Sequence, residues 1–483
     1  MTVQTVSPPR AQQLLERFSG AQSRPIVCIQ GLGFVGAAMA AAVASARDEA
    51  GELCFNVIGV DRSSPDGLGR IAAVNAGEFP FPTTDRKLAP ALRDAQRFGN
   101  LVATDDEHVY GLASIILIDV NFDLDRSGER PRFAMEPFRA ALAAIGKHMQ
   151  TDALVIVETT VPPGTCEKIV APELAQHLRA RELPDDRFLL AHAYERVMPG
   201  DHYLDSIVNF WRVYAGHTPA AADACERFLS ALVNVAEFPL RRLQSTTASE
   251  TAKVLENSYR AVTIAMMEEW GQFAELTGVD LFEIVSAIRV RPTHSNIRTP
   301  GLGVGGYCLT KDPLFAVVAA RDLFGASDMR FSFSERAVEV NSAMPLRACA
   351  RLKEKLGSLQ GKRLLLLGLA YRPDVGDTRS SASFDLWHAA EREGAIVLPH
   401  DPLVEPGAET GTYDPGNLPD AAEVDVVVFA VDHQFYRDFD FPAWLGESRP
   451  LIFDTNGVLG REQRAMFVRL GCPVVSVGRG DEA

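Results

Sequence analysis

The chain has 483 residues, of which 47% are hydrophobic and 23% are charged. This length is more than one hydrophobic core usually supports, so we expect two or three soluble domains. The formal net charge of −15 disfavours nucleic acid and anionic membranes as partners, because like charges repel at long range. The seven cysteines are scattered and form no Cys-x-x-Cys pair, which is typical of proteins of the reducing cytoplasm.

Strand-like runs rich in β-branched residues recur in the first half of the chain. They lie at residues 26–29, 55–60, 115–120 and 154–157, with a possible continuation at 188–191. Helix-permitting sequence separates them, which predicts a parallel, doubly wound sheet over residues 25–240. We expect residues 1–24 to form a polar N-terminal extension with a short amphipathic stretch at 14–18.

A dinucleotide-binding turn is predicted directly after the first strand, with the sequence Gly31-Leu32-Gly33-Phe34-Val35-Gly36. Its glycines let a pyrophosphate approach the backbone at a helix N-terminus. Residues 26–46 carry no charge, but this glycine spacing favours a strand, a turn and a buried helix over a signal peptide or a membrane span. A tight turn without a ligand is the alternative.

Asp61 follows the next predicted strand and can accept hydrogen bonds from both hydroxyls of a ribose. A 2′-phosphate would be repelled by this carboxylate, so the sequence favours NAD over NADP. Arg62, the next residue, weakens that preference and is itself a candidate cofactor contact.

Residues 247–277 are predicted to form one long helix, because apolar side chains recur at helical spacing from Ala252 to Phe273. Thr247 followed by Glu250 forms a capping-box signature at its start, and Gly278 can supply a C-terminal stop. A helix that is long and apolar on more than one side is typical of a domain connector or a dimer seam. We therefore expect a central helical dimerisation region at residues 241–345 and a homodimer or higher homo-oligomer.

Lys253 and Asn257 lie four residues apart on this helix and therefore on one face. Together they could hold an alkoxide and a water molecule. The alternative is a solvated Lys253 paired with Glu250 one turn earlier. The same spacing also resembles the catalytic helix of β-hydroxyacid dehydrogenases, so it indicates dehydrogenation without naming the substrate.

A glycine-dense loop at residues 301–313 carries one thiol, Cys308, and one carboxylate, Asp312. Glycines let the backbone approach a ligand closely, and a thiol beside a dinucleotide site suggests oxidation through a covalent intermediate. The alternative is that Cys308 is a small buried hydrophobe, as most lone cysteines are. The histidines show no metal-ligand spacing, so we assign no metal.

A second α/β unit begins at residues 362–368 and continues with strand-like runs at 395–398, 424–430 and 451–453. No glycine fingerprint follows its first strand. The predicted fold class is therefore α/β, with two Rossmann-like doubly wound domains joined by the long central helix. The second of these domains is expected to span residues 346–483.

These motifs together resemble the UDP-glucose/GDP-mannose dehydrogenase family, and more closely its UDP-N-acetylhexosamine branch. The resemblance runs from about residue 25 to residue 478. Beyond the two glycine motifs it includes Glu158-Thr159-Thr160-Val161-Pro162-Pro163-Gly164-Thr165, Glu195-Arg196-Val197-Met198-Pro199-Gly200, Glu256-Asn257-Ser258-Tyr259-Arg260, Gly368-Leu369-Ala370-Tyr371-Arg372-Pro373 and Asp377-Thr378-Arg379.

What the resemblance implies is an NAD-dependent oxidation of the C6 alcohol of a UDP-sugar to a carboxylate. An aldehyde forms first, the Cys308 thiolate attacks it, and oxidation of the thiohemiacetal gives a thioester that water cleaves. Lys253 and Asn257 would stabilise the oxyanions. Asp312 would orient the lysine and the water, and Glu195 would assist the hydrolysis.

The resemblance also assigns the ligand-binding residues. The second α/β domain would hold the UDP-sugar, with Arg372 and Arg379 as candidates for binding the diphosphate. Arg372 stands where the family commonly has lysine, which keeps the charge but changes the shape of the side chain. A surface salt bridge is the alternative for both arginines. Thr160 would contribute to the NAD site. The other substrate-binding candidates are Arg196, Arg260, His294, Arg298, Gly305 and Tyr371.

Departures from the family pattern bear on the identity of the sugar. Asn121-Phe122-Asp123 stands where a threonine is usual near the reacting centre, so that contact passes to Asn121 or disappears. Tyr307 precedes the cysteine in place of histidine or serine. An arginine that the family inserts toward the sugar is displaced, with His294 near its place and Arg291 and Arg298 flanking it.

Three alternatives to a UDP-N-acetylhexosamine 6-dehydrogenase therefore stay open. A UDP-glucose 6-dehydrogenase of the same family is the next candidate. A single-step hydroxyacid-type dehydrogenase would need neither Cys308 nor the second nucleotide domain, and Phe122 and Tyr307 at normally polar positions allow an inactive nucleotide-sugar binding protein. Polysaccharide biosynthesis and antibiotic biosynthesis are both open as the pathway served.

Overall fold

The computed structural model describes residues 10–19, 24–128 and 130–480. They divide into two compact units, unit 1 with Met1–Leu255 and Phe315–Met329, and unit 2 with Glu256–Leu314 and Arg330–Ala483. Most of the predicted N-terminal extension lies outside the described residues. Its amphipathic stretch forms helix α1 (Ala11–Ser19), which buries Leu14 and Phe18.

Unit 1 is built on an eight-stranded sheet with the strand order β10-β9-β8-β7-β4-β1-β2-β3. All its pairs are parallel except β8 with β9, so the predicted parallel, doubly wound sheet is confirmed. The strands are β1 (Ile26–Gln30), β2 (Asn56–Val60), β3 (Leu101–Thr104), β4 (Ile115–Ile118), β7 (Leu154–Val157), β8 (Leu189–His192), β9 (Val213–Gly216) and β10 (Arg241–Arg242). Sequence reasoning missed β3, β9 and β10, because these short strands lack a long β-branched run.

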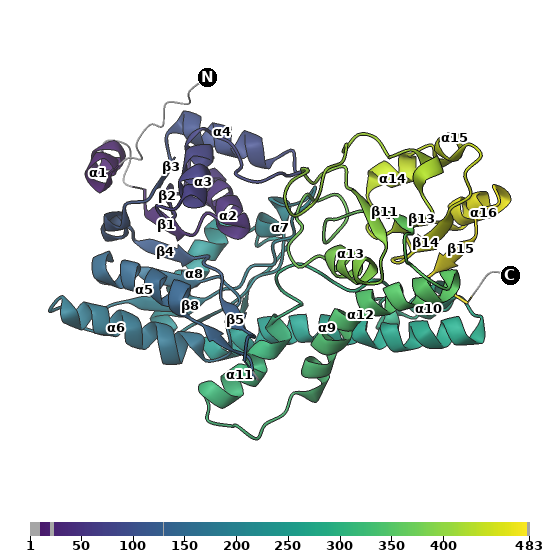
Figure 1. Cartoon of the computed structure of the whole chain (residues 1–483). Helices are drawn as coiled ribbons and strands as arrows, with labels where there is room; N and C mark the ends of the chain where they lie inside the picture. Colours follow the sequence, from purple (N-terminus) through teal and green to yellow (C-terminus); the bar gives the residue numbers. More distant parts are fainter. Residues whose placement is uncertain (1–9, 20–23, 129, 481–483) are drawn as a thin grey trace. The chain divides into compact units, whose positions relative to one another are not determined.

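Helices cover both faces of this sheet, with α2, α3 and α4 on one side and α5 and α6 on the other (Figure 1). This placement follows from right-handed crossovers that run outward in both directions from β1 and β4. The bounds are α2 (Phe34–Ser45), α3 (Pro65–Asn75), α4 (Leu88–Phe98), α5 (Glu136–His148), α6 (Ala171–Ala180), α7 (Asp205–Val208), α8 (Pro219–Leu232) and α11 (Phe315–Asp322). The uncharged residues 26–46 are thus strand β1 and the buried, alanine-rich helix α2. In the described part of the chain, no helix combines the length and the apolar character needed to cross a membrane.

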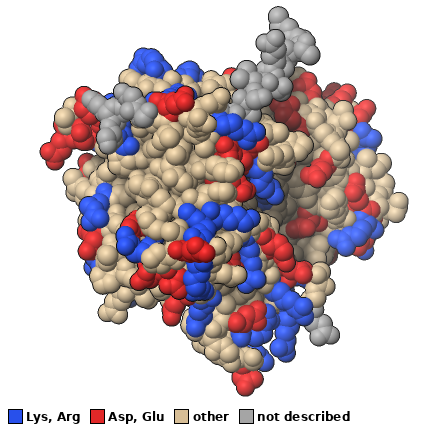
Figure 2. Space-filling view, turned by 90° about the vertical axis from the view of Figure 1, so that its left-hand side faces the viewer, with Lys and Arg blue, Asp and Glu red and all other residues tan. Residues whose placement is uncertain are grey.

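Surface charge is mixed on the face of the chain seen in Figure 2. Lysine and arginine side chains lie among aspartate and glutamate side chains there. Opposite charges at the surface of a protein attract only weakly because water screens them. The net charge of −15 is therefore not concentrated in one acidic patch on this face.

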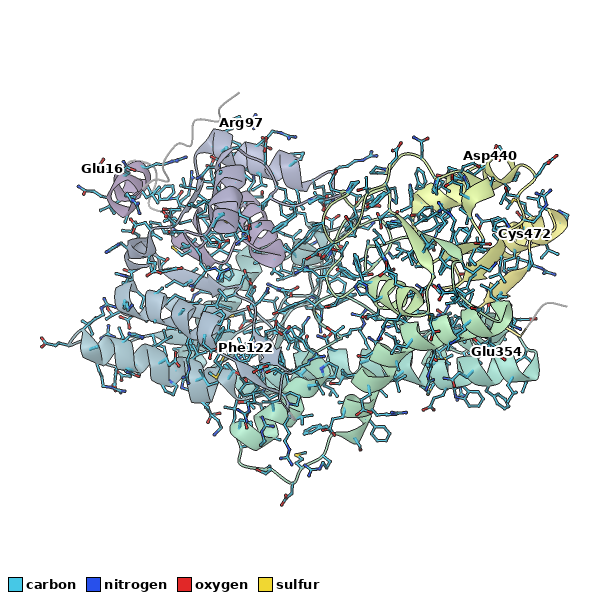
Figure 3. The ribbon with its side chains drawn as sticks, in the orientation of Figure 1. Glu16, Arg97, Phe122, Glu354, Asp440 and Cys472 are labelled. Atoms are coloured by element: carbon cyan, nitrogen blue, oxygen red, sulfur yellow. The ribbon has the colours of Figure 1, made fainter. Side chains whose placement is uncertain are left out.

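A short antiparallel hairpin, β5 (Asp123–Asp125) with β6 (Arg132–Ala134), extends the chain after β4. Phe122 at its base is fully buried and lies inside unit 1 in Figure 3. Its ring meets those of Phe133, Phe138 and Phe315 edge-on, with centroids 5.2 to 5.8 Å apart. Phe122 is thus a core residue of an aromatic cluster, which explains an apolar side chain at this position.

Helix α9 (Thr246–Thr277) confirms the predicted long helix; it begins in unit 1 and ends in unit 2. The predicted capping box is wrong, because Ser245 accepts the hydrogen bond at the helix start, from the backbone N–H of Ala248 at 3.1 Å. Glu250 is buried instead, and its carboxylate accepts bonds from the backbone N–H groups of Gly164 at 2.6 Å and Cys166 at 2.7 Å. Gly278 does end the helix, with a φ of +78°.

The buried Glu250 predicts a pH-dependent stability. Burial raises the pKa of Glu250 from 4.5 to about 7, against the opposing bonds from Cys166 and Gly164. Between these two pH values the unfolded chain has lost the proton and the folded chain has kept it, so stability falls as the pH rises, by something on the order of 3 kcal/mol. A Glu250→Gln variant lacks this titration. We expect the thermal midpoint of the natural chain to fall more between pH 5 and pH 8 than that of the variant, and equal shifts would contradict the assignment.

Unit 2 holds a five-stranded parallel sheet with the order β12-β11-β13-β14-β15. Alternate residues of β11 face opposite sides, as a strand requires: Leu364 and Leu366 pack with α12 and α13, and Leu365 and Leu367 pack with α14, α15 and α16. The strands are β11 (Arg363–Leu367), β12 (Ile396–His400), β13 (Val426–Phe429), β14 (Leu451–Asp454) and β15 (Val474–Ser476). The helices are α10 (Leu281–Arg289), α12 (Ser332–Leu356), α13 (Ala382–Arg392), α14 (Gln434–Asp438), α15 (Phe441–Leu445) and α16 (Arg461–Arg469). The second Rossmann-like domain of the predicted fold class is confirmed.

Candidate active site

The glycine turn after β1 has the shape that a pyrophosphate needs. Gly31 has a φ of +93°, and its N–H donates to the carbonyl of Val60 at 2.8 Å. A Cβ at Gly36 would lie 1.8 Å from the carbonyl oxygen of Gly31, so only glycine lets helix α2 start this close to the turn. Gly33, at the N-terminus of α2, has no described atom within 4 Å of the place where a Cβ would be. That open space lies where the first backbone N–H groups of the helix can meet an anion.

Phe34 and Val35 open helix α2 and are fixed by packing. The ring of Phe34 stacks on Phe81 with centroids 3.9 Å apart, and its carbonyl accepts a bond from the hydroxyl of Tyr203 at 2.7 Å. Val35 packs against the main core of unit 1. Sequence reasoning missed Phe81 and Tyr203, which lie far away along the chain.

Asp61 lies directly after β2, where its carboxylate accepts bonds from the backbone N–H of Leu32 at 3.0 Å and of Arg62 at 2.8 Å. Arg70 of α3 forms a two-pronged ion pair with it, at 2.8 and 3.1 Å. Burial alone would raise the pKa of Asp61, but Arg70 and the backbone N–H groups of Arg62 and Leu32 hold it below its ordinary value. The carboxylate is therefore ionised and ready to accept ribose hydroxyls. Arg70 was missed by sequence reasoning, and the side chain of Arg62 is exposed.

The open space at Gly33 gives a test of the NAD site. A Gly33→Ala variant should fold normally, because the added methyl meets no described atom, but it should weaken NAD binding about tenfold or more by occupying the place of the pyrophosphate. Gly69→Ala in α3 is a matched control, since that position is equally open. Titration of both variants with NADH, followed by fluorescence, measures the effect. Equal affinities in the two variants would contradict the site.

Further candidates follow the carboxyl ends of β4 and β7, at the edge of the sheet where ligands bind in such folds. Asn121 is exposed after β4, whereas its neighbour Phe122 points into the core. Thr159 donates its hydroxyl to the carbonyl of Val120 at 2.8 Å and so ties the two strand ends together. Thr160 lies beside it, partly buried.

A buried charged cluster that the sequence did not indicate lies at the same edge. Glu158 and Arg212 form a fully buried ion pair. Burial raises the pKa of Glu158 to about 7, with Arg212 opposing and Glu195 adding to the shift. Burial, with Glu158 and Glu195 nearby, also raises the pKa of Asp119 well above its ordinary value. This shift favours the protonated form of Asp119 beside the glycine turn, although Arg212 opposes it.

Lys253 of α9 is nearly buried in unit 1, where its ammonium donates to the carbonyl oxygen of Glu195 at 3.0 Å and lies over the ring of Tyr194. It is not paired with Glu250, so the solvated ion-pair alternative is wrong. The carboxylate of Glu195 accepts a bond from the backbone N–H of Val197. Lys253 retains two further N–H donors for an oxyanion.

Arg196 follows Glu195 and is also held in unit 1. Its guanidinium donates to the carbonyl of Trp211 at 2.6 Å and to the hydroxyl of Tyr194 at 3.1 Å. The same group lies 5.1 Å from the centre of the Tyr194 ring. Arg196 and Lys253 thus both contact Tyr194, a residue that sequence reasoning did not single out.

In unit 2, the side chains of Asn257, Lys311 and Asp312 form a buried chain of contacts. The amide of Asn257 donates to the carboxylate of Asp312 at 2.7 Å, and the ammonium of Lys311 contacts its other oxygen at 2.9 Å. Lys311 also lies 4.3 Å from the centre of the Tyr307 ring. The structure therefore brings two of the predicted catalytic residues, Asn257 and Asp312, into direct contact.

Cys308 is exposed, so the alternative of a buried hydrophobic cysteine is wrong. It begins a turn in which its carbonyl accepts bonds from the backbone N–H groups of Lys311 at 3.1 Å and Asp312 at 2.9 Å. Two asparagines that sequence reasoning missed anchor the loop before it. Asn341 exchanges two bonds of 2.8 Å with the backbone of Val304, and Asn456 accepts from the N–H of Leu302 at 2.7 Å.

Arginines gather near this thiol in unit 2. Burial and the neighbouring cations Arg298 and Arg372 lower the pKa of Arg260, while the nearby Cys308 and Glu256 raise it. The Nε of Arg298 is buried without a hydrogen-bond partner among the described residues. Like charges gathered in this way repel unless an anion joins them, so the cluster is suited to a diphosphate.

Tyr371 forms the wall against which the glycine loop packs. A Cβ at Gly305 or at Gly306 would lie 2.9 Å from side-chain atoms of Tyr371. Burial raises the pKa of Tyr371, so its hydroxyl stays protonated. Arg379 is engaged in a two-pronged ion pair with Asp377.

Among the described residues, no hydrogen bond or ion pair joins His294 to the arginines near Cys308. His294 ends the exposed 3-10 turn η3 (Pro292–His294), and its ring bonds the hydroxyl of Thr293 at 2.9 Å. Within the described ranges, no group of three or more His, Cys, Asp or Glu side chains is placed to hold a metal ion.

Comparison with known proteins identifies the family. Three domain models of the UDP-glucose/GDP-mannose dehydrogenase family match consecutive parts of the chain: the NAD binding domain at residues 26–232, the central domain at 247–343 and the UDP binding domain at 365–461. The chain is 30% identical over 465 residues to a UDP-N-acetyl-D-mannosamine dehydrogenase of Pyrococcus horikoshii, covering 94% of this chain and 99% of the relative. It is 29% identical to an NDP-N-acetyl-D-galactosaminuronic acid dehydrogenase of Ralstonia nicotianae, covering 89% and 96%.

A solved structure agrees with these matches. The UDP-D-ManNAc dehydrogenase of Pyrococcus horikoshii superposes with a TM-score of 0.77 at 26% identity, covering 95% of this chain and all of that one. The resemblance read from the motifs is thereby confirmed. The chain belongs to the UDP-glucose/GDP-mannose dehydrogenase family, and it is an NAD-dependent nucleotide-sugar dehydrogenase.

Proposed function

We propose that this dehydrogenase oxidises the C6 alcohol of a UDP-N-acetylhexosamine to the uronic acid, through a thioester on Cys308. The observation that carries the proposal is the exposed Cys308 thiol, held in an anchored glycine loop beside Arg260. The relatives named above act on N-acetylated sugars, which favours this substrate over UDP-glucose.

Cys308 is the nucleophile of the proposed reaction. Its sulfur adds to the C6 aldehyde to give a thiohemiacetal, whose oxidation gives a thioester. Water then adds to the thioester carbon, the carbon–sulfur bond breaks, and the thiolate leaves with the uronic acid as product. When bound, NAD accepts one electron pair in each of the two oxidations, so two NADH form for each sugar.

Two neighbouring groups of helix α9 stabilise the oxyanions in this scheme. Lys253 is fixed by the carbonyl of Glu195 and offers its remaining N–H donors to the C6 oxygen. Asn257, one helical turn later, is fixed by the carboxylate of Asp312. Asp312 also orients the water for hydrolysis, and the carboxylate of Glu195 accepts its proton.

The substrate diphosphate is bound by arginines of unit 2 in this proposal. Arg260, Arg298 and Arg372 supply three positive charges, which offset the overall charge of −15 where the anionic substrate binds. Arg372 is the main diphosphate ligand, because Arg379 is already paired with Asp377. Tyr371 and Gly305 shape the wall of the sugar site, and His294 and Arg196 remain predicted contacts.

We also propose a homodimer formed through helix α9. Large apolar side chains on this helix are exposed in the single chain, including Trp270 at 52% and Leu276 at 83%. Exposed apolar surface of this extent is typical of a subunit interface. A Trp270→Glu/Phe273→Glu variant should elute as a monomer in size-exclusion chromatography with light scattering. An unchanged mass would place the interface elsewhere.

We further propose that the domains span residues 25–240, 241–345 and 346–483. The proposal also includes a cytoplasmic location and a role in polysaccharide biosynthesis. The family matches at 26–232, 247–343 and 365–461 support this division. The free state of all seven cysteines is in keeping with a reducing compartment.

A substrate panel tests the proposed function. UDP-N-acetylmannosamine, UDP-N-acetylglucosamine, UDP-N-acetylgalactosamine, UDP-glucose and GDP-mannose are each incubated with NAD, and NADH absorbance and product mass are recorded. We expect two NADH per sugar and a uronic acid from one of the N-acetylated substrates. A single NADH without acid would indicate a one-step reaction, and binding without NADH would indicate an inactive binding protein. Faster turnover of UDP-glucose would reassign the sugar.

A further inference from the structure

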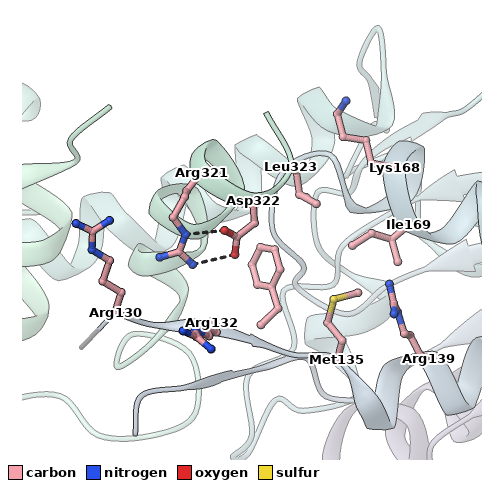
Figure 4. A pocket seen from close by; sticks show the side chains of 10 residues that line it. Arg130, Arg132, Met135, Arg139, Lys168, Ile169, Arg321, Asp322 and Leu323 are labelled. Carbon is pink, nitrogen blue, oxygen red and sulfur yellow. Dashed lines mark hydrogen bonds and ion pairs between the residues drawn. The ribbon is translucent and has the colours of Figure 1, made fainter. Parts of the chain in front are cut away.

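A second cavity lies in unit 1, and none of the residues that line it belongs to the NAD or sugar sites assigned above. Its volume is about 670 Å³. It lies between the β5–β6 hairpin, the start of α5, the π-helical turn η2 (Cys166–Val170) and the end of α11 (Figure 4). A cavity of this size can hold a small metabolite.

Positive charge dominates the lining. Among the described residues that line the cavity, one is acidic, Asp322, and five are basic: Arg130, Arg132, Arg139, Lys168 and Arg321. The chain as a whole has a formal charge of −15, so its average composition does not account for five cations around one cavity.

Two of the five cations are neutralised by neighbours. Arg321 forms a two-pronged pair with Asp322, at 2.5 and 2.8 Å (Figure 4). Arg139 pairs with Glu173 at 2.8 Å. Arg321 also donates to the carbonyl oxygen of Pro131 at 2.8 Å, so it holds in place the hairpin segment that carries Arg130 and Arg132.

The other three cations form no ion pair with a carboxylate in the part of the chain that the structure describes. No carboxylate of the described residues lies within 4 Å of the charged groups of Arg130, Arg132 or Lys168. Asp125 faces Arg132 across the hairpin and attracts it, but its carboxylate forms its hydrogen bond with the hydroxyl of Ser127. The ammonium of Lys168 lies 5.0 Å from the centre of the Phe324 ring. The ring carries no net charge, so this contact does not neutralise the ammonium.

Four apolar side chains also line the cavity. Phe133, Met135, Ile169 and Leu323 line it between the charged groups. Apolar walls lower the local dielectric constant, so they strengthen the attraction between the unpaired cations and an anion. Guanidinium groups match the geometry of phosphate oxygens, which they bind in pairs.

We propose that this cavity is a binding site for a phosphorylated small molecule that carries at least two phosphate charges. Arg130 and Arg132 of the hairpin and Lys168 of η2, which form no ion pair with another described residue, bind its phosphate oxygens, and the apolar side chains of the lining contact the rest of the molecule. The site is separate from the NAD and UDP-sugar sites, so the same chain binds three anionic ligands.

Calorimetric titration with inorganic pyrophosphate tests this site. The full chain is first saturated with NADH and UDP, so that the two diphosphate sites assigned above are filled and no turnover occurs. We expect one saturable site per chain, with an affinity that falls as salt is raised because ion contacts are screened. Inorganic sulfate, with a single anionic group, should bind at least tenfold more weakly.

Two pairs of substitutions locate the binding. Arg130→Ala/Arg132→Ala should weaken the affinity for pyrophosphate at least tenfold, and Lys168→Ala, on a different element, should weaken it as well. Arg93→Ala/Arg97→Ala removes the same charge from exposed positions of α4 and should leave the affinity within twofold; Arg97 projects from that helix in Figure 3.

Three results would overturn the proposal: no saturable binding of pyrophosphate, equal binding of sulfate, or an equal effect of the pocket and control pairs. The readout is binding without catalysis. A failure of the proposed oxidation, which the substrate panel measures, is therefore distinguishable from a failure here.

Discussion

A Cys308→Ala variant is expected to form no uronic acid. Without the sulfur no thioester can form, so the second oxidation loses its covalent intermediate, and acid production should fall by about 10³-fold or more. The binding groups around the thiol remain, so the variant should still bind the UDP-sugar and NAD. Product mass measured over a long incubation, together with the NADH yield per sugar, reports the loss.

Cys54→Ala is the matched control for this prediction. Cys54 is a partly exposed free thiol in unit 1, outside every site assigned here, so its removal should leave the acid yield unchanged. A Cys308→Ser variant adds a second comparison, because its hydroxyl is a weaker nucleophile and its ester is cleaved more slowly. An unchanged acid yield in Cys308→Ala would show that another group carries the acyl intermediate.

Local patterns predict those parts of the candidate site that lie close together along the chain. Gly31, Gly33 and Gly36 act within one turn, and Asp61 follows the next buried strand. Cys308 and Asp312 share one loop, so glycine spacing around them could indicate a close ligand approach. In each case the signal spans only a few residues, which a pattern in the sequence can hold.

Residues that act through distant partners gave no such signal. Glu250 suggested a helix cap, yet it bonds the backbone of Gly164 and Cys166, 86 and 84 residues away along the chain. Asn456 holds Leu302 across 154 residues. Arg70 also looked like an ordinary helix residue. Burial and tertiary pairing decide these roles, and neither can be read from the spacing of nearby residues.

The fold followed a similar division. The long runs of β1, β2 and β4 were predicted because each is a continuous apolar strand in a parallel sheet. Strand β10 has two residues, both exposed arginines, and pairs only with β9, so no hydrophobic pattern marks it. The aromatic cluster around Phe122 likewise depends on Phe315, which returns to unit 1 from much later in the chain.

The buried pair of Glu158 and Arg212 leads to an asymmetric prediction about stability. Glu158→Met leaves the guanidinium of Arg212 buried, 1% exposed, without its carboxylate, and this cation cannot lose its proton. We expect the free energy of unfolding to fall by about 3–5 kcal/mol. Arg212→Met should cost less, because the pKa of Glu158 is already raised to about 7 by burial and the carboxyl left behind can take a proton.

The double variant Glu158→Met/Arg212→Met separates this explanation from a simple loss of packing. Two apolar side chains in the interior need no partner, so the double variant should regain much of the stability lost in Glu158→Met. Urea unfolding followed by circular dichroism at pH 7 gives the three midpoints. If Arg212→Met were as costly as Glu158→Met, protonation of Glu158 would not be relieving the unpaired charge. If the double variant were the least stable of the three, shape rather than charge would govern this part of the core.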